Sequence, residues 1–348
     1  MIRSRKDTNL MLVVEKHNFS LHNPSWSYTL GPETYDTKDT PRRVERIRET
    51  LAGDPRFRFT TAKRRPSTLL ARLHPYHDFI KKTSQIARRT GEEVYPDLFP
   101  GEGARLQRRI HPLWGGLWCT DAETPIMGRT YEVAKGSAEA AITGAEILLG
   151  GQQREVYALC RPSGHHAGPR VFGGYCYFNN TATAAEVLAP HGTVAIFDID
   201  YHHGNGTQEF FDERNDVFTC SIHGDPNKEY PYFWGYTSER GTGQGEGANL
   251  NLPLPLGTGN DGYLKALDRA IRAIRRFKPS FVIVGAGFDT HAEDPIGGFA
   301  LSTDVYGEIG RRLASFDSPV LICQEGGYNL DVLGPCVHGL LTGFADHR

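Results

Sequence analysis

The stretch V-A-I-F-D-I-D-Y-H-H-G-N-G at residues 194–206 joins an uninterrupted apolar run to a cluster of carboxylates and imidazoles. Because its apolar residues do not alternate with polar ones, the run predicts a strand over residues 194–200 that is buried on both faces. Strands of this kind are typical of parallel sheets covered by helices. Further short apolar runs rich in β-branched residues predict more such strands, at residues 156–160, 217–223, 281–289 and 320–324.

Helical patterns separate these predicted strands. Residues 130–149 are rich in Ala and Glu, and Thr40 followed by Pro41 has the character of a helix N-cap and first helical residue. One more amphipathic helix is predicted by apolar residues at helical spacing, namely Leu264, Leu267, Ile271, Ile274 and Phe277. Residues 90–124 and 224–259 are rich in Gly with Pro or Trp and predict long loops. The sequence therefore predicts one α/β domain with a mainly parallel sheet between helices.

The composition indicates a soluble globular protein. Of 348 residues, 39 are Lys or Arg and 41 are Asp or Glu, and this balance gives no sign of a nucleic-acid partner. The apolar run near the start of the chain is too short for a signal peptide or a membrane span. The six cysteines form no C-x-x-C pattern, and Cys160, Cys220 and Cys323 lie inside apolar runs, which favours a reducing compartment. We therefore expect a cytoplasmic protein without nucleic-acid or membrane partners.

Polar residues follow the end of each predicted strand. The five apolar runs lead into R-P-S-G-H-H, D-Y-H-H, H-G-D, D-T-H and Q-E-G-G-Y. In open parallel sheets, ligands bind outside the carboxyl ends of the strands. The sequence therefore predicts that these groups meet at one edge of the sheet and form a site there.

Asp200 and His202 are candidate metal ligands, since Asp198, Asp200 and His202 would all project to one side if the strand conformation continued. A surface turn is the alternative, but two carboxylates at the end of a buried strand are costly unless paired or metal-bound. Asp289, which also closes a predicted strand, is the best candidate for a third ligand, with a helix N-cap as its alternative role and His291 as a competitor. Three protein ligands with an open position are typical of catalytic zinc.

The adjacent His165 and His166 lie in a Gly-flanked loop at a strand end. Although neighbouring histidines are often incidental, two imidazoles beside a metal site could act as a general base and its electrostatic partner. Each imidazole needs an orienting acceptor, and Asp198 and Asn205 are suitable groups. Tyr328, in E-G-G-Y-N, is either an ordinary turn tyrosine or a donor to a developing oxyanion.

Together, P-S-G-H-H-A, D-I-D-Y-H-H-G-N-G-T, G-F-D and E-G-G-Y resemble the histone deacetylase superfamily. Within it, C-R-P-S-G-H-H-A-G, F-G-G-Y-C-Y-F-N-N, H-G-D-P and Y-P-Y-F-W-G-Y are similar to the bacterial acetylpolyamine amidohydrolases. The similarity is dense over residues 157–329 and thinner over the first 150 residues, where R-R-V-E-R-I and L-H-P-Y-H-D-F-I carry it. It implies an arginase/deacetylase fold, with residues 1–348 forming a single doubly wound domain.

The resemblance also implies the chemistry of the site. It implies one zinc ion, with iron(II) as the alternative metal, held by Asp200, His202 and Asp289. It implies a catalytic set, with His166 as general base, that consists of His165, His166, Asp198, Asn205 and Tyr328. It also implies channel residues, namely Gly174, Tyr175 and Tyr230, and a structural potassium site formed by Asp198, Asp200, His202, Ser221 and Ile222. Asn205 matches the branch that contains class II deacetylases. The related arginases use two manganese ions, but His203 and Gly204 stand where further ligands would be required, which favours a single metal.

The loop at about residues 85–125 resembles an insertion that, in polyamine deacetylases, pairs two subunits at the entrance, so we expect a homodimer or higher oligomer. Glu123 is expected to bind the distal ammonium of a polyamine. Residues 110–120 contain no Asp or Glu and instead include His111, Pro112, Trp114 and Trp118, a departure that is compatible with a bulkier or aromatic N-acyl substrate. The leading hypothesis is hydrolysis of acetylpolyamines. Its alternatives are deacetylation of acetyl-lysine proteins or of an N-acyl biosynthetic intermediate and, more remotely, an inactive acyl-amine binding protein.

Overall fold

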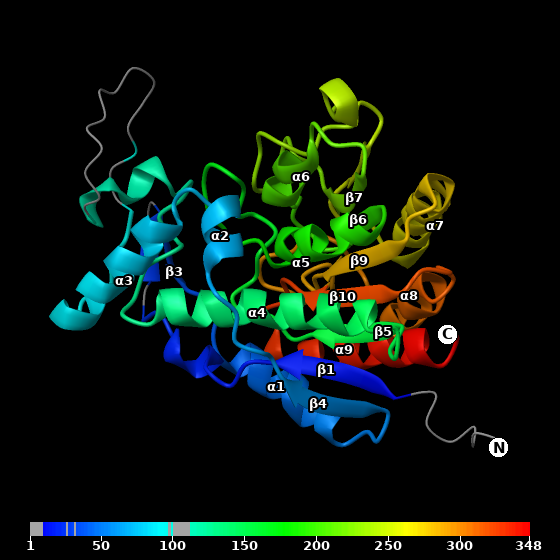
Figure 1. Ribbon diagram of the computed structural model, residues 1–348, viewed down its shortest axis with the longest axis horizontal. Helices are drawn as coiled ribbons and strands as arrows, with labels where there is room; N and C mark the ends of the chain where they lie inside the picture. Colours follow the sequence, from blue (N-terminus) through cyan, green and yellow to red (C-terminus); the bar gives the residue numbers. More distant parts are fainter. Residues whose placement is uncertain (1–9, 26, 31–32, 97–98, 100–111) are drawn as a thin grey trace.

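The computed structural model describes residues 10–25, 27–30, 33–96, 99 and 112–348 (Figure 1). The strands of its main sheet are β1 (Met11–Glu15), β4 (Phe57–Thr61), β5 (Glu155–Ala158), β6 (Val194–Asp198), β7 (Val217–Gly224), β8 (Asn249–Leu254), β9 (Phe281–Ala286) and β10 (Val320–Gln324). These eight strands lie in the order β4-β1-β5-β10-β9-β6-β7-β8, and every neighbouring pair is parallel. A separate antiparallel hairpin is formed by β2 (Ser27–Leu30) and β3 (Glu33–Asp36).

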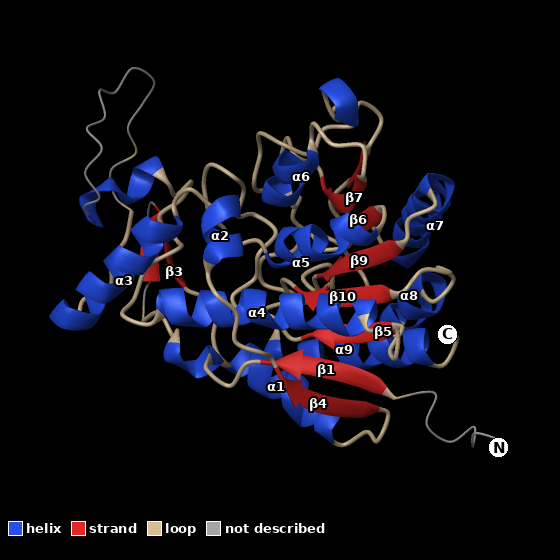
Figure 2. Ribbon diagram, viewed as in Figure 1, coloured by secondary structure: helices blue, strands red, loops and turns tan. Residues whose placement is uncertain are grey.

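Helices cover both faces of the main sheet, as Figure 2 shows. The α-helices are α1 (Arg42–Ala52), α2 (Thr68–Leu73), α3 (His77–Thr90), α4 (Thr130–Leu149), α5 (Asn180–Leu188), α6 (Asn205–Phe211), α7 (Asn260–Phe277), α8 (Val305–Leu313) and α9 (Leu330–Ala345). Buried residues of α4 and α5 share one apolar core with the sheet, and those of α1, α7, α8 and α9 share a core on the opposite face. This arrangement confirms the predicted doubly wound α/β fold.

The two cores explain the uninterrupted apolar runs. Along β10, Leu321 and Cys323 belong to the core beneath α4 and α5, whereas Val320 and Ile322 belong to the core on the other face. Because successive side chains of a strand point to opposite faces, both sets must be apolar when both faces are covered. The prediction of strands buried on both faces is therefore confirmed.

The strand boundaries differ from the predictions where polar groups begin. The predicted strand 194–200 ends at Asp198, and the predicted strand 281–289 ends at Ala286, so Asp200 and Asp289 lie in loops. Residues 224–259 are not one long loop, since they include the edge strand β8. The sequence of β8, N-L-N-L-P-L, contains a proline, which an edge strand tolerates and a central strand does not.

The start of α1 also differs by a residue from the prediction, because Pro41 occupies the N-cap position and makes no side-chain capping bond.

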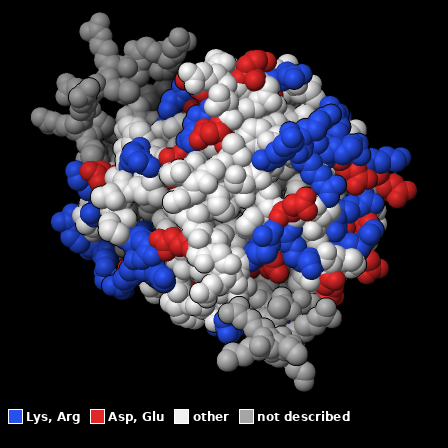
Figure 3. All heavy atoms as spheres, turned by 45° about the vertical axis from the view of Figure 1, so that its right-hand side comes forward, with Lys and Arg blue, Asp and Glu red and all other residues white. Residues whose placement is uncertain are grey.

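Much of the predicted entrance loop lies outside the described residues, namely 97–98 and 100–111. Among the described residues, no helix is long and apolar enough to cross a membrane. On the face drawn in Figure 3, acidic and basic side chains are interspersed, in keeping with the near-balance of charge in the sequence.

A buried histidine gives the fold a pH-dependent stability. His74 is enclosed, its Nε2 accepts the backbone N–H of Asn179 (3.2 Å), and burial lowers its pKa to about 3. An unfolded histidine has its pKa near 6.5, so the stabilisation is complete above pH 6.5 and is lost as the pH falls towards 3. Between pH 6.5 and 3, we expect protonation of His74 to lower the free energy of unfolding by about 1.4 kcal/mol for each unit by which the pH falls.

Urea unfolding of the wild type and His74→Gln at pH 6.5, 5.5 and 4.5 checks this expectation. The amide oxygen of glutamine replaces the Nε2 acceptor but does not titrate, so the variant should lose stability less steeply than the wild type as the pH falls. If the free energy of unfolding fell equally steeply with pH in both proteins, His74 would not contribute to the pH dependence of stability.

Candidate active site and metal centre

The loops that follow the carboxyl ends of the strands enclose a cavity of about 480 Å³. It is lined by Asp121, Glu123, His166, Gly174, Tyr175, His202, Glu229, Tyr230, Tyr232, Ile296 and Tyr328. Most of these residues belong to loops that follow β5, β7, β9 and β10 or to the turn after β6. The sequence prediction that polar groups from separate strands meet at one edge therefore agrees with the arrangement.

Asp200, His202 and Asp289 form a compact group whose ligand atoms all lie within 4.8 Å of one another. His202 Nδ1 is 3.0 Å from Asp289 Oδ2 and 3.4 Å from Asp200 Oδ1. Both carboxylates are fully buried. Two buried carboxylates side by side are costly without a compensating cation, so this donor set fits a divalent metal ion.

The electrostatics of the group point the same way. Burial first, and then the neighbouring charge of Asp200, raise the pKa of Asp289 to about 7. Although burial disfavours the imidazolium, hydrogen bonds to Asp200 and Asp289 raise the pKa of His202 to about 10. Both shifts show that the two buried carboxylates require positive charge beside them, which a proton or a metal ion can provide.

Backbone groups fix one oxygen of each carboxylate. The N–H of Gly326 donates to Asp200 Oδ2 (2.7 Å), and the N–H of Tyr201 donates to Asp289 Oδ1 (2.9 Å). A Cβ at Gly326 would lie 2.3 Å from Asp289 Oδ2, and a Cβ at Gly287 would lie 2.0 Å from Asp200 Oδ2. The backbone of Gly326 and Gly287 therefore lies against the two carboxylates, and only glycine fits at these two positions.

His291 does not belong to this group. Its Nε2 lies 3.1 Å from the Thr303 hydroxyl, and its Nδ1 accepts the N–H of Glu293 (3.1 Å). The ring also stacks on Tyr306, with centroids 6.4 Å apart. Both ring nitrogens are therefore engaged away from Asp200 and His202, which leaves Asp289 as the third member.

The paired imidazoles lie together, with the ring centroids of His165 and His166 4.0 Å apart. His165 Nδ1 is 2.9 Å from Asp198 Oδ2, and His166 Nδ1 is 2.8 Å from Asn205 Oδ1. The structure thus brings each histidine to the acceptor that the sequence predicted for it.

Their surroundings shift the two imidazoles in opposite directions. Burial opposes the charged form of both rings, but the charges of Asp200 and Asp198 raise the pKa of His165 well above 6.5. Burial and the neighbouring charge of His165 lower the pKa of His166 well below 6.5. Of the two neighbouring imidazoles, His165 therefore holds a proton more readily than His166, and it is His166 that lines the cavity.

Asp198, Asp200 and His202 do not meet through a continuing strand, which corrects the expectation from the sequence. The strand β6 ends at Asp198, and the chain then turns so that the N–H of Asp200 donates to Asp198 Oδ1 (3.1 Å). Asp198 consequently faces His165, while Asp200 faces His202. Across the sheet, Asp198 pairs in register with Ser221 of β7, which is followed by the buried Ile222.

Tyr328 lies on a loop that two other elements hold in place. The N–H of Tyr328 donates to Asp294 Oδ2 (2.7 Å), and the guanidinium of Arg43 donates to the carbonyls of Gly327 and Glu325 (2.6 Å each). That guanidinium also lies 4.4 Å from the centre of the Tyr328 ring. Burial raises the pKa of Tyr328 well above 10, so its hydroxyl stays protonated and can donate a hydrogen bond.

The sequence alone assigned no role to Arg43 or Asp294. One signal for Arg43 was present, since a buried arginine interrupts the apolar face that Val44 and Ile47 give to α1. Asp294 carries no comparable signal, because the Tyr328 and Asn329 N–H groups that donate to it lie more than 30 residues further along the chain.

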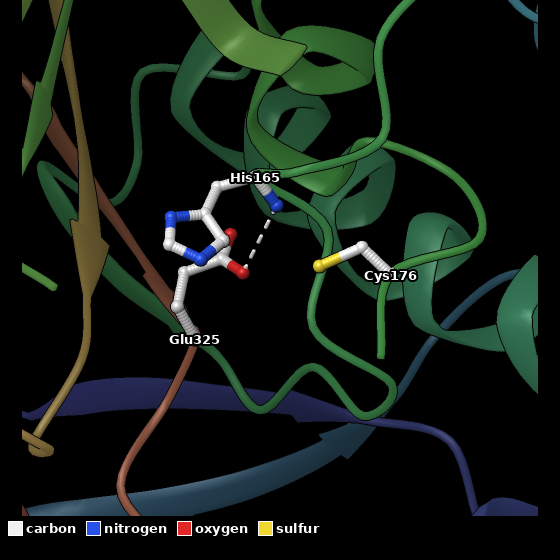
Figure 4. A group of neighbouring side chains, drawn as sticks. All are labelled: His165, Cys176 and Glu325. Atoms are coloured by element: carbon white, nitrogen blue, oxygen red, sulfur yellow. Dashed lines mark hydrogen bonds between the residues drawn. The ribbon is translucent and has the colours of Figure 1, made fainter. Parts of the chain in front are cut away.

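Glu325 ties the loop after β10 to the histidine loop (Figure 4). Its Oε2 accepts the backbone N–H groups of Gly164 (2.7 Å) and His165 (3.3 Å). Glu325 also forms a second group of potential ligands with His165 and Cys176, and burial raises the pKa of its carboxyl to about 8. A carboxyl that is largely neutral at pH 7 and already bonded to backbone is better suited to positioning His165 than to holding a metal ion.

The predicted channel residues line the cavity beside the imidazoles. The ring of Tyr230 is 4.8 Å from that of His166, and the ring of Tyr175 is 5.8 Å from that of Tyr328. Gly174 and Tyr175 both have left-handed backbone conformations, with φ of 56° and 64°. Such a conformation costs a tyrosine about 1–2 kcal/mol, and strain of this kind is common at functional sites.

The predicted entrance loop lies only partly within the described residues. His111 lies outside them, as do the side chains of Pro112 and Trp114. Trp118 is described, and its ring packs against Tyr76 at 6.4 Å and is not part of the cavity lining. Glu123 does line the cavity, where its carboxylate lies 3.5 Å from the Tyr175 hydroxyl.

A parallel sheet thus carries paired imidazoles and an Asp–His–Asp group at its carboxyl edge, which is the arrangement expected from the resemblance to the arginase/deacetylase fold. The chain belongs to the histone deacetylase family, since residues 37–344 match the family model described as the histone deacetylase domain.

Named relatives support this membership. The chain is 43% identical over 286 residues to acetylpolyamine amidohydrolase 1 of Pseudomonas aeruginosa, which covers 79% of this chain and 82% of the relative. It is also 43% identical to the acetylpolyamine amidohydrolase of Mycoplana ramosa, over 66% of this chain and 68% of that protein. With relatives that are named amidohydrolases, the chain is a hydrolase that acts on amide bonds.

A solved structure gives the same result. The crystal structure of acetylpolyamine aminohydrolase from Burkholderia pseudomallei superposes with a TM-score of 0.91 at 33% identity and covers 97% of this chain and 99% of that chain. The crystal structure of the HDA15 HD domain superposes with a TM-score of 0.80 at 26% identity, over 96% and 90% of the two chains. The predicted family and fold are therefore confirmed.

Proposed function

We propose that this chain is a zinc-dependent amidohydrolase that removes acetyl groups from N-acetylated amines, with acetylpolyamines as its substrates. The observation that carries the proposal is the joint placement of the Asp200, His202 and Asp289 group and a cavity that is lined by carboxylates. Among the described residues, that cavity is lined by Asp121, Glu123 and Glu229 but by no Lys or Arg. Such a lining favours a cationic amine, and the named relatives have substrates of this kind.

Asp200, His202 and Asp289 would hold the metal, and their oxygen and nitrogen donors also suit iron(II). A metal ion with three protein ligands acts as a Lewis acid and lowers the pKa of water. A structural potassium ion is proposed nearby, with oxygen atoms supplied by Asp198, Asp200, His202, Ser221 and Ile222. The adjacency of Asp198 and Ser221 in the β6–β7 register supports this second site.

The neutral His166 would accept the proton of the attacking water, because it is the imidazole that lines the cavity and has the lowered pKa. His165, held by Asp198, would be the more basic of the two imidazoles and would stabilise negative charge beside it. Asn205 keeps His166 oriented through Nδ1, so that Nε2 is left for proton transfer. The leaving amine nitrogen then takes up a proton from an imidazole.

Tyr328 would donate its hydroxyl hydrogen bond to the amide oxygen as that oxygen gains negative charge. Arg43 and Asp294 would set the position of the loop, and therefore of the hydroxyl. Gly174, Tyr175 and Tyr230 would line the channel for the acyl-amine chain, with Tyr230 next to His166.

Glu123 is proposed to bind a distal ammonium group of the substrate. A charge-assisted hydrogen bond contributes about 1.5–3 kcal/mol. In Glu123→Gln we therefore expect kcat/KM for acetylputrescine to fall by about 10- to 100-fold. An uncharged N-alkylacetamide of the same length should change by less than about 3-fold. Steady-state kinetics on both compounds checks the expectation, and an equal loss on both would remove the ammonium-binding role.

The function itself is tested by the rates at which the zinc-loaded protein deacetylates acetylputrescine, acetylcadaverine, acetylspermidine and an acetyl-lysine peptide. Preference for the small acetylated amines supports the proposal. Activity on the peptide alone would instead favour acetyl-lysine proteins, and no activity on any of them would favour an N-acyl biosynthetic intermediate or an inactive binding protein.

We further propose that the protein is a cytoplasmic homodimer that pairs through the entrance loop at about residues 85–125. All six cysteines are buried and free, which suits a reducing compartment. Light scattering at micromolar concentration would show twice the chain mass of 38.7 kDa for a dimer, and a monomeric mass would contradict the pairing.

A further inference from the structure

Three carboxylates line the cavity, and one of them is committed to the architecture of the site. Asp121 Oδ2 accepts the N–H of Gly174 (2.6 Å) and lies 3.3 Å from the Tyr230 hydroxyl that donates to it. Its Oδ1 accepts the N–H of Glu123 (2.9 Å) and the hydroxyl of Thr124 (2.9 Å). Asp121 therefore ties the channel loops together, and its carboxylate oxygens are already used within the protein.

Glu229 approaches the cavity from the loop after β7. Its N–H donates to the carbonyl of Asp225 (3.0 Å), and its own carbonyl accepts the N–H of Tyr232 (3.0 Å), so a local turn fixes its backbone. A Cβ at Gly224 would lie 3.0 Å from Glu229 Cγ and 2.9 Å from the Tyr201 hydroxyl. The Glu229 side chain thus packs over Gly224, next to Tyr201.

The two glutamates line the cavity from chain segments more than 100 residues apart, and each of these segments is called a wall of the cavity. Glu123 lies beside Tyr175, whose ring faces Tyr328. Glu229 lies on the segment of Tyr230, whose ring faces His166. A substrate that extends from the imidazoles towards solvent therefore passes between walls that each carry a carboxylate.

Aromatic rings continue the second wall outwards. The rings of Tyr230 and Tyr232 have centroids 6.4 Å apart, and Tyr232 is 49% exposed. Tyr232 also has a left-handed backbone with φ of 61°, which is costly for a residue other than glycine. Tyrosine faces attract ammonium groups and cover methylene chains, so this wall suits a flexible polycation.

We propose that Glu229 is a specificity-determining residue that binds a second ammonium group, so that the chain prefers N-acetylated triamines over N-acetylated diamines. The proposal rests on the proposed deacetylase function and refines its substrate class. One ammonium group pairs with Glu123 and the other with Glu229, and the methylene spacer between them lies against the tyrosine rings. A diamine offers one ammonium group after acetylation and cannot engage both carboxylates.

The test compares Glu229→Gln with the wild type on acetylspermidine, acetylputrescine and a neutral N-alkylacetamide. Glutamine keeps the volume of the side chain and removes its charge. We expect kcat/KM for acetylspermidine to fall by about 10-fold, mainly through KM, and the values for acetylputrescine and the acetamide to change by less than about 2-fold. An unchanged melting temperature would show that the loop is intact.

Glu246→Gln is the matched control, since Glu246 is exposed in the same inter-strand segment and does not line the cavity. An equal loss of acetylspermidine activity in this variant would show that the effect comes from the overall negative charge of the segment, and it would overturn the proposal. The proposal is also wrong if Glu229→Gln affects diamine and triamine equally or affects neither. A wild type that deacetylates acetylputrescine and acetylspermidine equally refutes only this inference, whereas one that deacetylates no acetylated amine refutes the proposed function as well.

Discussion

Replacement of Tyr328 by phenylalanine is expected to lower kcat by about 10²- to 10³-fold, because loss of one oxyanion donor has an effect of this size in other hydrolases. The substitution removes only the hydroxyl group. The guanidinium of Arg43 keeps its bonds to the carbonyls of Gly327 and Glu325, so the loop should hold its position. Zinc content and KM should stay close to the wild-type values, since Tyr328 is not among the metal-binding group.

The measurement is steady-state kinetics on an acetylated amine together with metal analysis of the same preparation. Tyr131→Phe is the matched control, because the Tyr131 hydroxyl bonds to His77 (3.0 Å) and does not line the cavity. If Tyr328→Phe retained activity near that of the control, the proposed oxyanion role would be wrong.

Replacement of Asp200 by asparagine is expected to remove the metal and with it the activity. The change leaves a neutral ligand oxygen in a fully buried position and halves the carboxylate charge of the group. Metal affinity should fall by more than about 100-fold, beyond the range known for partners that only support a ligand. Asparagine keeps an acceptor oxygen for the N–H of Gly326, which favours retention of the fold.

Zinc titration followed by melting temperature separates this result from misfolding. A ligand that binds only the folded state adds about 2.7 kcal/mol of stability at a hundredfold excess over its Kd. The wild type should therefore melt at a higher temperature with zinc, and Asp200→Asn should show a cooperative transition without that increase. Full zinc occupancy in the variant at equimolar metal would contradict the ligand role.

The sheet could be predicted from the sequence because its strands are apolar on both faces. The edge strand β8 could not, since its N-L-N-L-P-L pattern contains a proline and two asparagines, which can be buried because they bond to Gln208. Strand ends were also extended too far, over Asp200 and Asp289. Asp200 and Asp289 directly follow apolar residues, as the last residue of a strand does. The sequence therefore does not show that the chain has already turned before them.

The central part of the candidate site could be predicted because its residues fall within short motifs. The choice between Asp289 and His291 depended on where the chain turns after β9, and only the three-dimensional arrangement shows which of them lies beside Asp200 and His202. Arg43, Asp121 and Asp294 act through contacts between distant parts of the chain. Arg43, for example, bonds to a carbonyl 284 residues away, so no local pattern could have revealed its partner.

Gly287 and Gly326 approach the Asp200 and Asp289 carboxylates closely, so the two regions of the site, the carboxylate group and the mouth of the cavity, tolerate amino-acid substitution to different degrees. Around the two carboxylates, any added side chain would meet an oxygen within 2.3 Å at these positions, so mutations there would be eliminated whatever the substrate. The glutamates and tyrosines at the mouth meet no such barrier, because they stand on loops that face solvent. New substrate preferences, whether natural or selected in the laboratory, should therefore arise through changes at the mouth, while the hydrolytic chemistry is inherited unaltered.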